Sequence, residues 1–144
     1  MSNPTTIDGV LVALLAADTG ITDIVGTRIK PYANTVGTTG PYLTYFRITT
    51  TRDRTNDGPT GQAIVHYQLD CWAAEALTVR NLANTVRLAL DGYRANPFLG
   101  WKIDFVFIEN ESDGANEPVA PGQSIPIQRV TLDVTISVAE TVNF

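Results

Sequence analysis

Apolar and polar residues alternate strictly from Arg129 to Val138, and the same period of two recurs from Val65 to Cys71. This period is typical of strands that have one buried and one exposed face in an antiparallel sheet. The polar positions of both stretches then share one face: His66, Gln68, Asp70, Arg129, Thr131, Asp133 and Thr135. That face is rich in short side chains, which suits either contact with another subunit or plain solvation, and the pattern leaves both open.

Three segments carry the apolar spacing of helices. Pro4 is placed to open the first helix, and Gly20 is predicted to end it. A short helical turn follows and stops at Gly26, and the longest helix runs from about Glu75 to a C-terminal cap at Gly92. The predicted buried stripes are Ile7, Val10, Leu11, Leu14 and Leu15 in the first helix, and Ala76, Val79, Leu82, Ala83, Val86 and Leu90 in the last.

Two more long strands are predicted, at residues 42–50 and 101–107. The predicted face residues are Tyr42, Phe46 and Ile48 in the first strand, and Trp101, Ile103, Phe105 and Phe107 in the second. Residues 28–32 are short and extended, and Pro31 excludes them from the centre of a sheet. Glycine, proline and polar residues predict loops at 33–40, 51–61 and 109–124.

This order of elements predicts an α+β fold, with a largely antiparallel sheet of four to five strands and two main helices packed on one face. The chain has 144 residues, without an internal repeat or a dividing linker, so we expect one domain over residues 1–144. No apolar run is long enough to cross a membrane, and Met1–Pro4 does not resemble a signal peptide. We therefore expect a soluble protein of a reducing cytoplasm, without membrane contact.

Charge is unevenly distributed along the chain, although its net value is only -5. The segment 28–54 is basic, with Arg28, Lys30, Arg47, Arg52 and Arg54 against Asp53. The part from Asp104 onward is acidic, with Asp104, Glu109, Glu111, Asp113, Glu117, Asp133 and Glu140 against Arg129. Such a chain can pair head-to-tail with copies of itself. The alternative is that the two segments are solvated loops.

Residue types for catalysis or metal binding are sparse. His66 and Cys71 are the only histidine and cysteine, and within one strand they point to opposite faces. Cys71 is expected to be a small buried hydrophobe, and the glycines at 58 and 61 lack the lysine of a phosphate loop. The sequence therefore predicts no enzyme, no metal site and no cofactor.

The sequence gives little support for a nucleic-acid binding site. Net acidity gives no reason to expect non-specific binding of DNA. The arginines of the basic segment stand close in sequence to Tyr42, Tyr45 and Phe46, which is a pattern of single-strand binding surfaces. We expect these aromatic rings to fill the core instead, which leaves the loop arginines to contact phosphate or an acidic protein surface.

Six motifs, in this order, resemble one protein family: Val25–Pro31, Pro41–Tyr45, Asp57–Gly61, Tyr67–Ala73, Leu90–Gly92 and Arg129–Val134. The chain is similar over nearly its whole length to the tail-completion, or tail terminator, proteins of long-tailed phages and gene transfer agents. Residues 93–126 fit that family least well.

The resemblance implies a virion structural protein of the neck, assembled in the host cytoplasm. Such proteins form a ring, usually a hexamer, on the head-proximal end of the tail tube, where they stop tube growth and make the head-tail connection. The implied partners are other copies of the chain, the tube protein and the head–tail connector or stopper, while DNA passes the lumen without specific binding. The alternatives are another neck or tube-like subunit, or a non-viral binding module.

Candidate subunit-interface or lumen residues follow from charge and the predicted loops. They are Arg47, Arg52, Arg54, Asp57, Glu109, Glu111, Asp113 and Arg129. One of the loops 51–61 and 109–124 is expected to project into the lumen or onto a neighbouring subunit.

Overall fold

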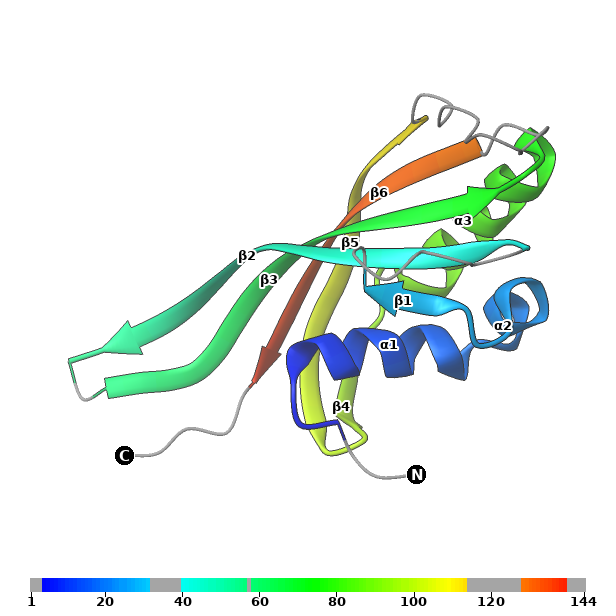
Figure 1. Ribbon diagram of the computed structural model, residues 1–144. Helices are drawn as coiled ribbons and strands as arrows, with labels where there is room; N and C mark the ends of the chain where they lie inside the picture. The colour runs from blue at the N-terminus through cyan, green and yellow to red at the C-terminus, as the bar shows by residue number, and fades with distance from the viewer. Residues whose placement is uncertain (1–3, 32–39, 57, 114–127, 140–144) are drawn as a thin grey trace.

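A computed structural model describes residues 4–31, 40–56, 58–113 and 128–139. The elements in chain order are α1 (Ile7–Ala17), α2 (Thr19–Val25), β1 (Ile29–Pro31), β2 (Tyr42–Thr55), β3 (Gly58–Ala73), α3 (Ala76–Leu90), β4 (Ala95–Phe98), β5 (Trp101–Asp113) and β6 (Gln128–Ala139). The strands form one sheet in the order β1-β2-β3-β6-β5-β4, which curls past the helices (Figure 1). Only β1 and β2 pair in parallel.

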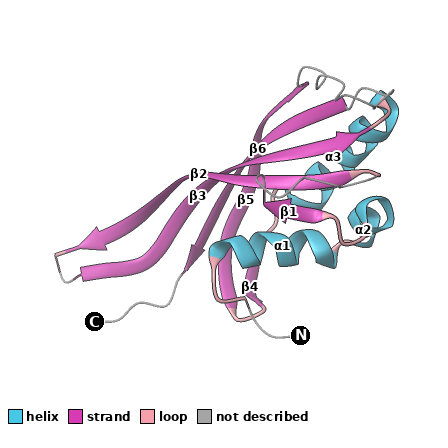
Figure 2. Cartoon of the chain, in the orientation of Figure 1, coloured by secondary structure: helices cyan, strands magenta, loops and turns pink. Residues whose placement is uncertain are grey.

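The predicted α+β class and the largely antiparallel sheet are confirmed, but the predicted numbers of strands and helices are wrong. The fold is α+β (Figure 2), and buried residues of the helices and strands form one core. The described part holds six strands and three helices, where four to five strands and two main helices were predicted. The missed strand is β4, whose four residues include Pro97 and precede a turn at Gly100, so its local sequence looked like a loop.

Capping residues set the limits of the helices. The Thr6 hydroxyl accepts a hydrogen bond of 3.1 Å from the Gly9 amide at the start of α1. Asp18 ends α1 and caps α2, accepting a bond of 3.0 Å from Ile21. The prediction that Gly20 ends the first helix is therefore wrong, because this glycine lies in the first turn of α2. The predicted stop at Gly26 is confirmed.

The helix predicted from Glu75 is also confirmed. Glu75 is the N-cap of α3, and Gly92 follows the C-cap with φ of 81°, a conformation that glycine adopts without strain. Ala76 is exposed, whereas the other five stripe residues are buried against the sheet. The period-two prediction for β3 and β6 is confirmed as well, since their nine apolar inward positions belong to the core.

A β-bulge changes the predicted face of the strand that begins at Trp101. The register of β5 against β6 shifts between Ile103 and Phe105, so Asp104 is an extra residue. Ile103 and Val106 are buried, while Phe107 turns to the opposite face and is 46% exposed. The prediction of unbroken alternation through Phe107 is therefore wrong, because one inserted residue exchanges the two faces.

The predicted loop at 51–61 is instead the tip of a long hairpin. β2 continues to Thr55 and pairs there with Gly58, the first residue of β3. β6 pairs with β3 only from Gln62 onward, so the hairpin end projects beyond the rest of the sheet (Figure 1). We call residues 49–61 the β2–β3 arm.

The other two predicted loops are only partly tested. Residues 109–113, predicted as part of a loop, form the end of β5. The rest of that segment lies outside the described residues, as does 33–39. Pro31 does lie in an edge strand, as predicted, because β1 has β2 as its only neighbour in the described sheet.

Candidate assembly surfaces

The sheet face turned away from the helices, which we call the open face, carries the polar residues predicted for it. Hydrogen bonds join them across the strands. The Thr131 hydroxyl donates to a carboxylate oxygen of Asp70 over 2.7 Å, and Thr135 lies 2.9 Å from Nδ1 of His66. Within β3, Gln68 Nε2 also donates to Asp70, over 3.1 Å. Asp70 is only 1% exposed, and these hydrogen bonds satisfy its buried carboxylate within the sheet.

Aromatic and cationic groups close one end of the open face. The Tyr42 ring stacks on Trp72 with centroids 5.7 Å apart, and the Arg129 guanidinium lies 5.3 Å from the Trp72 ring. The indole N–H of Trp72 donates to the Thr44 hydroxyl over 2.9 Å. Arg129, a predicted interface residue, is thus held on the open face.

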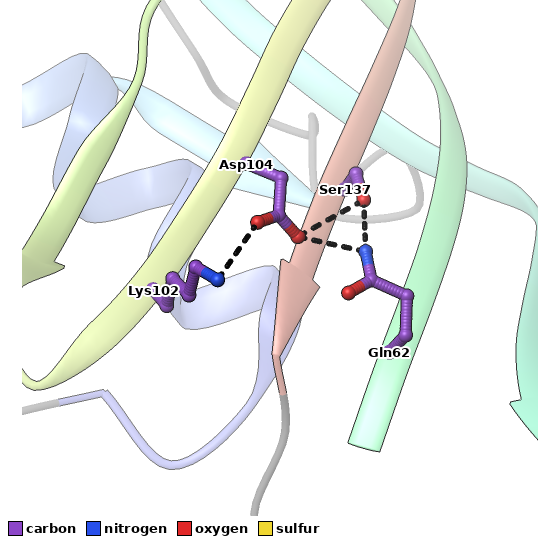
Figure 3. Close-up of polar contacts among 4 residues, drawn as sticks. All are labelled: Gln62, Lys102, Asp104 and Ser137. Carbon is purple, nitrogen blue, oxygen red and sulfur yellow. Dashed lines mark hydrogen bonds and ion pairs between the residues drawn. The ribbon is translucent and has the colours of Figure 1, made fainter. Parts of the chain in front are cut away.

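A second polar cluster surrounds the bulge at Asp104 of β5 (Figure 3). Asp104 Oδ2 accepts from Gln62 Nε2 over 2.7 Å and from the Ser137 hydroxyl over 3.4 Å. Gln62 Nε2 also bonds Ser137, and Lys102 Nζ is 3.6 Å from Asp104 Oδ1. Three strands therefore hold the residue that turns Phe105 and Phe107 to the open face.

Apolar side chains are exposed at both margins of the open face. Phe46 is 53% exposed on β2, while on β5 the rings of Phe105 and Phe107 stack with centroids 4.6 Å apart. Ile48, predicted to share the face of Phe46, is 50% exposed at a register shift between Arg47 and Thr49 that interrupts the alternation. The expectation that Phe46 fills the core is therefore wrong. Tyr42 is buried, but on the open face, and Tyr45 packs partly against the core. Alternation alone could not reveal these exposed rings, because aromatic residues in strands usually indicate a core.

The predicted basic residues fall in two places. Arg52 and Arg54 are exposed in the β2–β3 arm. Arg47 lies nearer the body, with its Nε 4.0 Å from Asp8 in the first turn of α1. Asp8 also accepts a hydrogen bond from the Tyr67 hydroxyl, whose pKa is raised by burial and then by this carboxylate.

The predicted acidic residues lie together at the end of β5. Glu109, Glu111 and Asp113 are all exposed, and Asp113 forms an ion pair with Arg80 of α3. β2 and β5 are separated by β3 and β6, so the arginines of the arm and this acidic end belong to opposite sides of the sheet. Asp57 lies outside the described residues.

The described residues bring no catalytic group together with another. Cys71 is fully buried, and burial raises the pKa of its thiol, with Asp70 and Glu111 as smaller causes. His66 is on the opposite face of the same strand. Over the described ranges, no three metal-ligating side chains form a group, and no helix is long and apolar enough to cross a membrane.

Comparisons with known proteins give a family match and a fold match for this chain. Residues 9–117 match the family model described as Tail completion protein gp17. Among solved structures, a chain from the "Virion of native gene transfer agent (GTA) particle" has the same fold, with a TM-score of 0.65 and 17% sequence identity. The alignment covers 94% of this chain and 99% of that chain. No curated protein matches. Because the family model spans most of the sequence, the chain belongs to the Tail completion protein gp17 family and is a structural component of a phage-type tail.

Proposed function

We propose that this chain is the tail terminator, which forms a ring on the head-proximal end of the tail tube. In this role the ring stops tube growth and presents the surface that joins the tail to the head. Membership of the tail completion family supports a role at the end of a tail rather than along it. A copy number of six is part of the proposal and rests on the resemblance described above.

The observation that carries the proposal is the pair of unlike surfaces on opposite sides of one sheet. The β2–β3 arm exposes Arg52 and Arg54 on either side of Asp53, and the end of β5 is acidic through Glu109 and Glu111. A closed ring of identical subunits needs a heterologous interface, in which two different surfaces of each copy meet. Opposite charges on these surfaces favour the correct neighbour and disfavour contacts between like surfaces.

A terminator ring must also let DNA pass, since the genome crosses the neck. Each phosphate contact made by a lysine or arginine adds affinity for DNA. The open face carries Asp70, Asp104 and Asp133 against Lys102 and Arg129, so it presents no excess of positive charge. We propose that DNA passes the ring without specific binding, whichever face lines the lumen.

Electron microscopy of particles from a strain with the gene interrupted tests this function. The proposal predicts overlong tails together with separate, DNA-filled heads, because nothing stops the tube or offers the head a surface. Complementation with the intact gene should restore tails of defined length that are joined to heads. Normal tails on heads would refute the proposal. Complete absence of tails would also refute it, and would indicate a tube or initiator component.

A further inference from the structure

We propose that neighbouring copies join by antiparallel pairing between the β2 edge of the β2–β3 arm and the end of β5, with Arg52 opposite Glu111. The occupant of each edge is a second copy of this chain. The inference rests on the ring proposed above and names the contact that would close it. Four features support it: the uncovered edges of the two strands, their opposite charges, the face from which these side chains project, and the directions of the strands.

Both edges lack a neighbouring strand in the part of the chain that the structure describes. β1 covers β2 only from Leu43 to Tyr45. β4 covers only the start of β5, and backbone bonds from Gly92 and Tyr93 reach no further along that strand than Val106. The Asp91 side chain accepts a hydrogen bond of 3.0 Å from the Ile108 amide, and beyond Ile108 the end of β5 has only β6 as a neighbour among the described strands. Uncovered edges of this kind readily pair with another chain.

Charge and side-chain direction agree with this pairing. Arg52 pairs with Ala63 and Glu111 with Leu132, and both partners are fully buried core residues. Cross-strand partners share a face, so Arg52 and Glu111 both project from the face that bears the helices. A sheet continued from one copy to the next would therefore bring the two charges onto the same side.

The polarity of the sheet gives the required antiparallel orientation. β2, β3, β6 and β5 are each antiparallel to the next, so β2 and β5 run in opposite directions. Placing copies head-to-tail, with the same face inward, makes β5 of one copy antiparallel to β2 of the next. The interface thus needs no reversal of either subunit.

The stagger between copies is also consistent with a closed ring. Within one subunit, the successive partners of Glu111 across the sheet are Leu132, Leu69 and Tyr45. Arg52 pairs with Ala63, which is six residues from Leu69 along β3. Pairing Arg52 with Glu111 therefore shifts neighbours by roughly 20 Å, at about 3.3 Å a residue. Over four strands, about 19 Å wide, that shift gives a strand tilt of about 45°, at the upper end of the range for closed barrels.

Disulfide trapping tests the contact. A chain with Arg52→Cys and Glu111→Cys should give a covalent ladder of multimers on mild oxidation, because directly opposed residues in antiparallel strands are within disulfide reach. Within one subunit these positions lie on strands separated by two others, so the bond must be intermolecular. Cys71 is fully buried and does not compete.

The matched control is Arg52→Cys with Ser112→Cys. Ser112 pairs with Thr131 of the open face, so it points away from Arg52 of the neighbour and should give no ladder. Charge reversal supplies a second test. Arg52→Glu and Glu111→Arg should each reduce the ring fraction and the double variant should restore it, while Arg87→Glu on α3 should leave it unchanged. The absence of a ladder from both the purified protein and isolated particles would overturn the pairing.

Failure of this contact is distinguishable from failure of the proposed function. If gene interruption gives overlong tails but particles containing the double-cysteine chain yield no ladder, the edge pairing is wrong and the terminator role stands. If the ladder forms but interruption leaves normal tails joined to heads, the pairing stands and the terminator role is wrong.

Discussion

The bulge at Asp104 gives opposite consequences for the same substitution at two adjacent residues. Val106 is fully buried in the core, whereas Phe107 is 46% exposed on the open face. Val106→Asp places a carboxylate in the apolar core, and its desolvation costs several kcal/mol in a protein interior. Phe107→Asp loses about half the burial of one ring and its stack on Phe105, which amounts to about 1–2 kcal/mol.

Urea unfolding followed by circular dichroism distinguishes the two variants. Domains of this size are stable by about 5–15 kcal/mol, so Val106→Asp should lose most or all of its cooperative transition. Phe107→Asp should keep the transition, with a modestly lowered midpoint and an unchanged slope. The opposite order, with Phe107→Asp unfolded and Val106→Asp close to the native protein, would show that alternation runs unbroken and that the bulge is absent.

Three further predictions concern polar contacts. Asp70→Ala should lower the free energy of unfolding by about 2 kcal/mol in a urea titration, because it leaves the Thr131 hydroxyl without its acceptor. An unchanged urea midpoint would contradict the buried network. Burial raises the pKa of Tyr67 above its ordinary value, so an unfolded chain releases this proton first and stability should fall as pH rises above about 10, by about 1.4 kcal/mol per pH unit. Tyr67→Phe should remove that part of the alkaline slope, and an identical slope between pH 9 and 11 would disprove it. Arg80→Ala should cost less than about 1 kcal/mol, since the ion pair with Asp113 is exposed, and the difference should vanish in 1 M salt; a larger or salt-independent loss of thermal stability would contradict a surface pair.

Much of the fold follows from periodicity alone. The alternation in β3 and β6 identified both faces of the central strands, and the stripe from Val79 to Leu90 identified the long helix. These signals are reliable because burial on one side of a strand or helix repeats with the geometry of the backbone.

The errors have a shared physical origin, which is that the local sequence pattern does not contain the tertiary placement of a segment. One extra residue at Asp104 exchanged the faces of β5 without any change in composition, and a second register shift follows between Ile108 and Asn110. The β2–β3 arm was predicted as a loop because a two-stranded projection has no core beneath it to impose alternation, and its tip carries Gly58 and Pro59. Tertiary placement decided both cases.

The charges of the candidate assembly residues could be predicted from the sequence, but their positions on the surface could not. Separation of basic and acidic segments indicated two unlike regions, and the sheet order puts β2 and β5 on opposite sides of the sheet. Arg47 lies outside the arm, because it pairs with Tyr67 in the sheet and is thereby close to Asp8 of α1. The exposed rings of Phe46 and Phe107 were missed, since strand aromatics are read as core.

A cryo-electron microscopy reconstruction of the head–tail junction in intact particles tests the terminator ring most directly. The proposal predicts that this chain forms one closed ring per particle, between the last ring of the tail tube and the head. Density for the chain repeated along the tube, or its absence from the junction, would contradict it.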